Sequence, residues 1–168
     1  NTVMQLDSTK NILVYHKSKL VPGVEVMPFP AVMKYLEKWA IDMGGTVGSL
    51  GTQDERSPFL SSDNNIKVAP IICYESVFGE FVTNYVKNGA NFLSIITNDG
   101  WWGDTPGYKQ HLAYARLRAI ENRRWIARSA NTGISCFITP KGEVEQPTNW
   151  WTTAAIAQNI ELNQQTTF

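Results

Sequence analysis

An alternation of apolar and amphipathic runs between residues 67 and 131 constrains the fold of this sequence more than any other feature. KVAPIICYE (67–75) predicts a buried strand, and SVFGEFVTNYVKNGA (76–90) predicts a helix closed by Asn88-Gly89. NFLSIIT (91–97) predicts a second buried strand, followed by a loop (98–108), a helix (109–124) and a third strand (125–131). Apolar strands separated by helices indicate an α/β layered fold.

The flanking sequence adds further strands and a long polar stretch. Residues 3–20 predict two strands joined by a turn at 7–11, residues 21–30 a proline-rich loop, and residues 31–40 a short amphipathic helix. Residues 42–65 predict a loop with room for one short strand, and two more strands are predicted at 134–140 and 153–162. No repeat or domain boundary is visible.

Composition excludes several classes of protein. The chain has 15 basic and 15 acidic residues, so its net charge does not favour nucleic acid as a partner. No apolar run reaches the roughly 18 residues needed to span a bilayer, and no signal peptide is visible. The two cysteines and two histidines lack zinc-binding spacing; a disulfide between Cys73 and Cys136 stays open at this stage. Because the numbering begins at Asn1, we expect a processed product or a piece excised from a longer protein.

Cys73 is the first candidate for chemistry, because it follows an apolar strand and precedes a helix. In α/β folds the carboxyl ends of strands carry the active sites, and backbone N–H groups of the following turn can stabilise a thiolate or an oxyanion. The alternative is an inert cysteine in the core. Either histidine, His16 or His111, could be an ordinary surface or capping residue. Lys17, Glu25 and Glu75 are the other candidates to activate the thiol, and each is weak when taken alone.

Four stretches taken together resemble the nitrilase (carbon–nitrogen hydrolase) superfamily: YHKSKLVPGVE, ICYES, TNDGWWGD and HLAYARLRAIENRRWIARSANTG. The combination of Y-x-K-x-x-L-V-P-x-x-E with C-Y-E is similar to the apolipoprotein N-acyltransferase branch. This resemblance implies an α/β fold of the nitrilase-like α-β-β-α sandwich type. Residues 1–168 would then be the C-terminal portion of the catalytic domain.

The resemblance also implies roles for individual residues. Cys73 matches the nucleophile that forms a thioester, and Lys17 matches the lysine that stabilises the oxyanion. Glu25 and Glu75 match supporting carboxylates, and Glu25 would orient Lys17 or the incoming amine. Tyr74 matches a supporting aromatic position whose N–H is a second oxyanion donor, and Trp101 a position that lines the substrate pocket; plain packing is the alternative for both rings.

One member of the implied triad has no counterpart here. The family places its general-base glutamate on a strand well before the lysine, and no glutamate precedes Lys17 in this sequence. We therefore expect the base, and any membrane-spanning segment, to lie outside this chain, and the chain alone to be inactive.

For the intact enzyme the resemblance implies acyl transfer without a metal or organic cofactor. The donor would be a membrane phospholipid and the acceptor the N-terminal diacylglyceryl-cysteine of a lipoprotein. The site would face the extracytoplasmic side of the bacterial inner membrane. A soluble amidase of the same superfamily, or a non-catalytic module that binds lipid or a partner, are the alternatives.

Two further expectations concern surfaces. Met27, Phe29, Met33 and Trp39 could form an apolar arm over the site, the alternative being a helix packed on the core. Arg116, Arg118 and Glu121 are expected to form structural ion pairs. A partial sandwich is expected to expose apolar sheet surface and therefore to self-associate or to have a loose edge.

Overall fold

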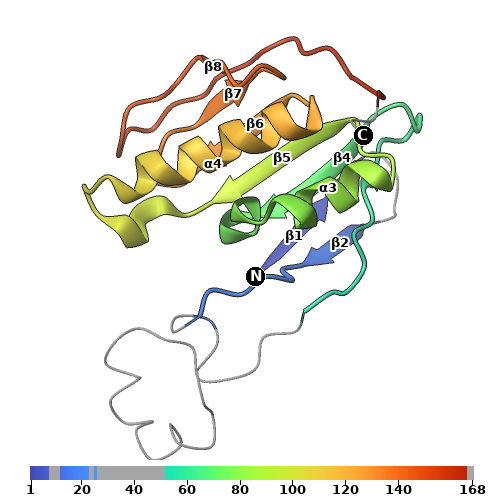
Figure 1. Cartoon of the computed structure of the whole chain (residues 1–168), viewed down its shortest axis with the longest axis horizontal. Helices are drawn as coiled ribbons and strands as arrows, with labels where there is room; N and C mark the ends of the chain where they lie inside the picture. Colours follow the sequence, from blue (N-terminus) through green and yellow to red (C-terminus); the bar gives the residue numbers. More distant parts are fainter. Residues whose placement is uncertain (8–11, 23–24, 26–51, 166–168) are drawn as a thin grey trace, which may run out of the picture.

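The fold is built on a six-stranded mixed sheet with the strand order β3-β4-β5-β6-β7-β8 (Figure 1). The structure is a computed structural model that describes residues 1–7, 12–22, 25 and 52–165. β4, β5 and β6 pair in parallel, and β3, β7 and β8 extend the sheet in antiparallel fashion. The strands span Phe59–Leu60 (β3), Lys67–Ile72 (β4), Phe92–Thr97 (β5), Ile126–Ala130 (β6), Cys136–Ile138 (β7) and Val144–Glu145 (β8). The predicted α/β class is confirmed.

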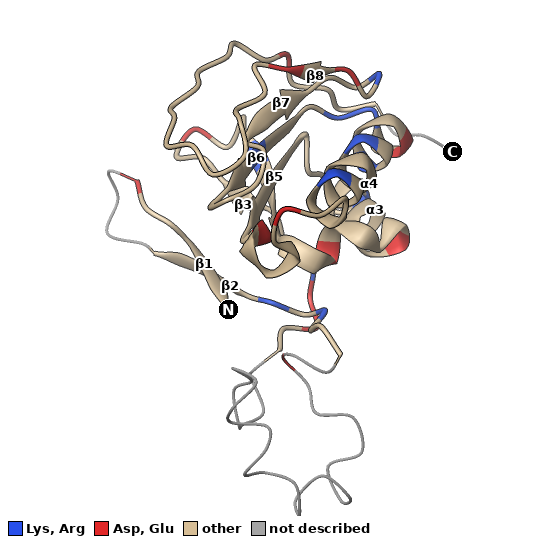
Figure 2. Ribbon diagram, turned by 90° about the vertical axis from the view of Figure 1, so that its left-hand side faces the viewer, with Lys and Arg blue, Asp and Glu red and all other residues tan. Residues whose placement is uncertain are grey.

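Two helices, α3 (Gly79–Lys87) and α4 (Gly107–Asn122), lie on one side of this sheet (Figures 1 and 2). Each connects two neighbouring parallel strands, as the alternation in the sequence predicts. The core between helices and sheet is formed by side chains such as Tyr85, Ile71, Leu93 and Ile95, none of which is exposed. Burying an isoleucine side chain contributes about 1.5–3 kcal/mol, so this layer stabilises the central strands.

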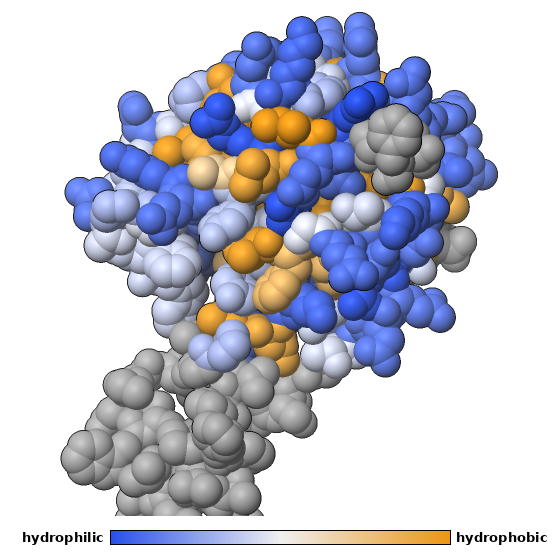
Figure 3. All heavy atoms as spheres, viewed as in Figure 1, coloured by the Kyte–Doolittle hydropathy of each residue, from blue (hydrophilic) through white to orange (hydrophobic). Residues whose placement is uncertain are grey.

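The opposite face of the sheet is less covered. Along β5 the burial alternates, because successive side chains of a strand point to opposite faces. Ile95 is fully buried toward the helices, whereas Ile96 on the other face is 42% exposed. On the helix side, apolar residues are interspersed with hydrophilic ones (Figure 3). Ile96 is therefore an apolar side chain exposed on the face away from the helices; a larger apolar surface and self-association stay predictions.

A separate two-stranded sheet, β1 (Thr2–Gln5) and β2 (Leu13–His16), forms the predicted N-terminal hairpin. It packs against the β3 and β4 edge of the main sheet and against α3. The side-chain amide of Gln5 donates to the carbonyl of Leu60 at 2.6 Å, and the rings of Tyr15 and Tyr85 meet edge to face at 6.0 Å between centroids. This packing brings the end of β2, and with it Lys17, to the main sheet.

The structure corrects the prediction at three places. A short 3₁₀ turn, η2 (Cys73–Val77), lies between β4 and α3, so α3 begins at Gly79 rather than near residue 76. Helix α4 ends at 122 because Arg123 is left-handed, with φ 49°. The strand predicted at 153–162 is wrong: this segment is irregular, and side-chain amides bond it in place of a backbone ladder, such as that of Gln146, which donates to the carbonyl of Ala157 at 2.8 Å.

Other predictions have separate outcomes. The short strand within 42–65 is confirmed as β3. The helix at 31–40, with the apolar arm of Met27, Phe29, Met33 and Trp39, lies outside the described residues. Arg118 pairs with Glu121 at 2.7 Å, as expected, but Arg116 donates to the carbonyl of Gly142 instead. In the described ranges, no helix combines the length and the apolar character that crossing a membrane requires.

Candidate active site

Cys73 lies where β4 ends, as the first residue of the η2 turn. Its backbone is left-handed, with φ 50°, a conformation that non-glycine residues rarely adopt. The thiol is free and the residue half-buried, at the wall of a pocket of about 500 Å³. Cys136 is buried in β7, where burial raises the pKa of its thiol to about 11, and it too is free. The two cysteines therefore form no disulfide, and only Cys73 among them reaches the pocket.

Lys17 reaches the same pocket from the end of β2 and is paired with Glu25. The ammonium of Lys17 donates to both carboxylate oxygens of Glu25, at 2.8 and 2.7 Å. The Lys17 side chain is almost fully buried and Glu25 is partly exposed. The backbone N–H of Val21 also donates to a carboxylate oxygen of Glu25, at 2.7 Å, and helps to fix the position of this carboxylate. A buried cation with a fixed orientation therefore stands in the pocket that contains the thiol.

Glu75 connects these two parts of the site without lining the pocket. Its carboxylate accepts hydrogen bonds from the hydroxyl of Tyr15 and from the backbone N–H groups of Ser18 and Lys19, the two residues that follow Lys17. The second oxygen accepts from the N–H of Ile72, the residue before Cys73, at 2.8 Å. Burial raises the pKa of Glu75, although the four donors act to lower it. Glu75 thus holds the segment that follows Lys17 close to the turn that carries Cys73.

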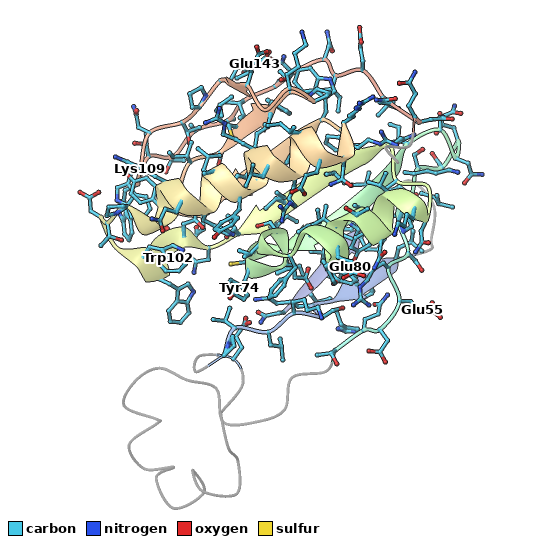
Figure 4. The ribbon with its side chains drawn as sticks, in the orientation of Figure 1. Glu55, Tyr74, Glu80, Trp102, Lys109 and Glu143 are labelled. Atoms are coloured by element: carbon cyan, nitrogen blue, oxygen red, sulfur yellow. The ribbon has the colours of Figure 1, made fainter. Side chains whose placement is uncertain are left out.

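Aromatic and apolar side chains make up most of the remaining wall. Tyr74 and Trp102 both lie along this edge of the molecule, at the ends of β4 and β5 (Figure 4). The Tyr74 ring packs edge to face on Phe78, with centroids 5.3 Å apart. Trp101 lines the pocket but is 65% exposed. The described lining residues are Lys17, Val21, Glu25, Cys73, Tyr74, Val77, Asn98, Trp101, Trp102, Gly107, Gln110, His111 and Tyr114.

The structure adds one functional candidate that sequence reasoning missed. His111 on α4 is not a surface or capping residue: it is buried and lines the pocket beside Cys73. Its Nδ1 lies 2.9 Å from Asp99 and its Nε2 3.1 Å from the carbonyl oxygen of Cys73. His16, in contrast, is exposed and does not line the pocket. A signal was available, because His111 shares the buried face of α4 with Ala115.

Asp99 is held within this cluster by strong electrostatic contacts. Arg128 donates to it at 2.6 Å, and the Asp99 side chain is completely buried. Burial alone would raise the pKa of Asp99, but the hydrogen bond from His111 and the charge of Arg128 outweigh that effect and lower the pKa to about 2. Asp99 is therefore a carboxylate at neutral pH. The described residues contain no group of three or more His, Cys, Asp or Glu side chains suited to a metal ion.

The site can be compared with known proteins. The chain is 38% identical over 159 residues to the apolipoprotein N-acyltransferase of Chlorobaculum tepidum, an alignment that covers 94% of this chain and 30% of that protein. The apolipoprotein N-acyltransferase of Aquifex aeolicus is 34% identical over 86% of this chain and 31% of its own length. The chain thus spans about a third of the length of these relatives.

Solved structures support the fold. An amidase of the nitrilase superfamily from Nesterenkonia AN1 superposes with a TM-score of 0.58 at 19% identity, over 89% of this chain and 51% of that one. A carbon–nitrogen hydrolase from Helicobacter pylori G27 superposes with a TM-score of 0.58 at 17% identity, over 88% of this chain and 52% of that one. The predicted nitrilase-like fold, present in part, is confirmed. The carbon-nitrogen hydrolase family model matches residues 1–167, so the chain belongs to the carbon–nitrogen hydrolase family.

Proposed function

We propose that this chain is the C-terminal portion of the catalytic domain of an apolipoprotein N-acyltransferase. The observation that carries the proposal is one pocket lined by the half-buried thiol of Cys73, the Lys17–Glu25 pair and apolar aromatic walls. A cysteine nucleophile suits acyl transfer because it divides one difficult transfer into two easier ones through a thioester. The sequence similarity to relatives named apolipoprotein N-acyltransferase supports this choice of reaction.

In the first half-reaction, the Cys73 thiolate attacks the ester carbonyl of a phospholipid. The negative charge that develops on the carbonyl oxygen would be stabilised by the Lys17 ammonium, with the N–H of Tyr74 as a second donor. Glu25 holds that ammonium through both oxygens, so Lys17 is oriented before substrate arrives. Collapse of the intermediate forms the thioester and releases a lysophospholipid.

In the second half-reaction, the α-amino group of a diacylglyceryl-cysteine attacks the thioester and releases the thiol. Both halves need a base, first for the thiol proton and then for the amine proton. Glu25 is the carboxylate among the described lining residues, and Lys17 occupies both its oxygens. The resemblance to the carbon–nitrogen hydrolase family puts the base on a glutamate well before the lysine, and on that ground we assign the base to a glutamate outside this chain. Trp101 and Trp102, both exposed at the pocket, would contact the acyl chain.

We propose that the reaction, with a membrane phospholipid as donor and a lipoprotein as acceptor, takes place at the outer face of the bacterial inner membrane. The exposed tryptophans at the pocket suit such a location, because tryptophan is favoured at membrane–water interfaces. The reaction as proposed requires no metal or organic cofactor.

The test uses the full-length protein and a phospholipid with a labelled acyl chain. We expect a hydroxylamine-sensitive acyl group on Cys73, which then moves to a peptide with an N-terminal diacylglyceryl-cysteine. Cys73→Ala should abolish both steps, and Lys17→Met should abolish thioester formation, whereas Cys136→Ala should abolish neither. Transfer that persists in Cys73→Ala would refute the proposal, and hydrolysis of small amides without transfer would favour an amidase.

The proposed location of the base has its own test. The 168-residue chain, incubated alone with the labelled phospholipid, should form no thioester. A labelled Cys73 thioester on the isolated chain would show that the base lies within these residues.

A further inference from the structure

The backbone of Cys73 is strained, and identifiable contacts hold it in place. A non-glycine residue at φ 50° persists only when its surroundings fix it. The carbonyl oxygen of Cys73 accepts a hydrogen bond from the hydroxyl of Ser76 at 2.8 Å and lies 3.1 Å from Nε2 of His111. Two separate groups therefore hold the peptide that follows the nucleophile.

His111 is itself fixed from the opposite side of its ring. Its Nδ1 faces the Asp99 carboxylate at 2.9 Å, and Asp99 is held in turn by the hydroxyl of Thr97 and by Arg128. The side chains of all four residues are buried. The packing is also tight: a Cβ at Gly133 would lie 2.2 Å from a carboxylate oxygen of Asp99. The ring therefore has little freedom to move away from Cys73.

Both nitrogens of the His111 ring have polar neighbours. Nδ1 faces the Asp99 carboxylate at 2.9 Å and the guanidinium of Arg128 at 3.4 Å. Nε2 faces the hydroxyl of Ser76 at 3.0 Å and the carbonyl oxygen of Cys73 at 3.1 Å. These contacts on opposite sides of the ring fix its position between Asp99 and the backbone of Cys73.

We propose that His111, held in place by Asp99, is a positioning residue that fixes the left-handed backbone of Cys73 and thereby directs the thiol into the pocket. This rests on the proposed role of Cys73 as nucleophile. His111 acts through the carbonyl of Cys73, and the proposal requires no proton transfer to the sulfur.

The first test measures the rate at which iodoacetamide alkylates Cys73, followed by mass spectrometry. His111→Gln and Asp99→Asn should each slow this reaction at least about tenfold, because a small displacement of a reacting atom has a large effect on rate. The double variant should be no slower than the slower single variant, since both act through one contact. His16→Gln is the matched control and should label at the wild-type rate. Cys136, which is fully buried, serves as an internal reporter and should stay unlabelled while the fold is intact.

The second test follows the ring of His111 directly. The chain has two histidines, so His16→Gln leaves His111 as the only source of imidazole signals in a long-range ¹H–¹⁵N spectrum. Adding Asp99→Asn to this chain should shift those signals, because Asp99 contacts Nδ1. Imidazole signals that Asp99→Asn leaves unchanged, or wild-type labelling of Cys73 in a folded His111→Gln chain, would overturn the proposal. Neither measurement uses an acyl donor, so both are independent of whether acyl transfer is the reaction.

Discussion

Replacing Glu75 with glutamine tests whether this buried carboxylate joins the lysine segment to the nucleophile turn. Glutamine has nearly the same shape but only one accepting oxygen. In the structure one carboxylate oxygen accepts from Tyr15, Ser18 and Lys19, and the other accepts from Ile72. If the amide oxygen takes the first three donors, the amide nitrogen must face the N–H of Ile72. Two donors then face each other in a buried site.

The expected magnitude follows from that loss. A buried donor left without its acceptor costs about 1–3 kcal/mol, and removing a desolvated charge offsets part of this cost. We therefore expect Glu75→Gln to lower the free energy of unfolding by about 2 kcal/mol, because the N–H of the half-buried Ile72 loses its acceptor. For a domain of this size, that loss lowers the Tm by about 4–8 °C. Because Lys17 and Cys73 are no longer held together, alkylation of Cys73 should slow as well.

The assay combines thermal denaturation with iodoacetamide labelling of the native protein. Glu80→Gln is the control, since Glu80 is an exposed acid in the first turn of α3 and should change stability by less than about 0.5 kcal/mol. If Glu75→Gln were as stable as Glu80→Gln and labelled at the wild-type rate, the connecting role of Glu75 would be refuted.

Three further predictions concern the buried cluster and the core. Asp99 has a folded-state pKa lowered from 3.8 to about 2, so it contributes about 2 kcal/mol that is fully present above pH 4 and is lost as the pH falls toward 2. Asp99→Asn should remove this pH dependence from denaturation midpoints, and an unchanged acid profile would contradict the assignment. Gly133→Ala should destabilise the protein by about 1–3 kcal/mol and slow Cys73 labelling, because its Cβ collides with Asp99; wild-type values in urea denaturation would argue against that contact. Ile95→Ala should lower the free energy of unfolding by about 2–5 kcal/mol, whereas Ile96→Ala, at the half-exposed neighbour, should lower it by less than about 1 kcal/mol. Equal losses of stability in the two variants would contradict the assignment of the two sheet faces.

The central strands and helices were predictable because their signal is local. The apolar runs at β4 and β5 and the 3.6-residue period of α3 can each be recognised within a short stretch of the sequence. The strand predicted at 153–162 failed because its apolar residues resemble a strand, whereas side-chain amides rather than a backbone ladder bond the segment. Sequence gives no sign of such partners.

The candidate site was predictable only in part. Cys73, Lys17 and Glu25 came from motifs and line one pocket, as expected; their catalytic roles stay predictions. The left-handed φ of Cys73 was not foreseen, because cysteine carries no intrinsic preference for that conformation. The connecting role of Glu75 depends on Ser18, 57 residues away in sequence, which only the folded chain brings close.

The order of the strands has a consequence for how the site assembles during folding. Every strand of the main sheet is paired with the next strand along the chain, so this sheet can grow by successive local additions. Pairing between successive strands involves shorter sequence separations than pairing with a distant segment does, which lowers the entropy cost of each addition. The hairpin that carries Lys17 is a separate sheet and must dock from a distance, with the loop-closure entropy that this entails. The unit containing Cys73 and His111 can therefore form first, so that for part of the folding time the thiol is exposed without the ammonium that Glu75 later brings beside it.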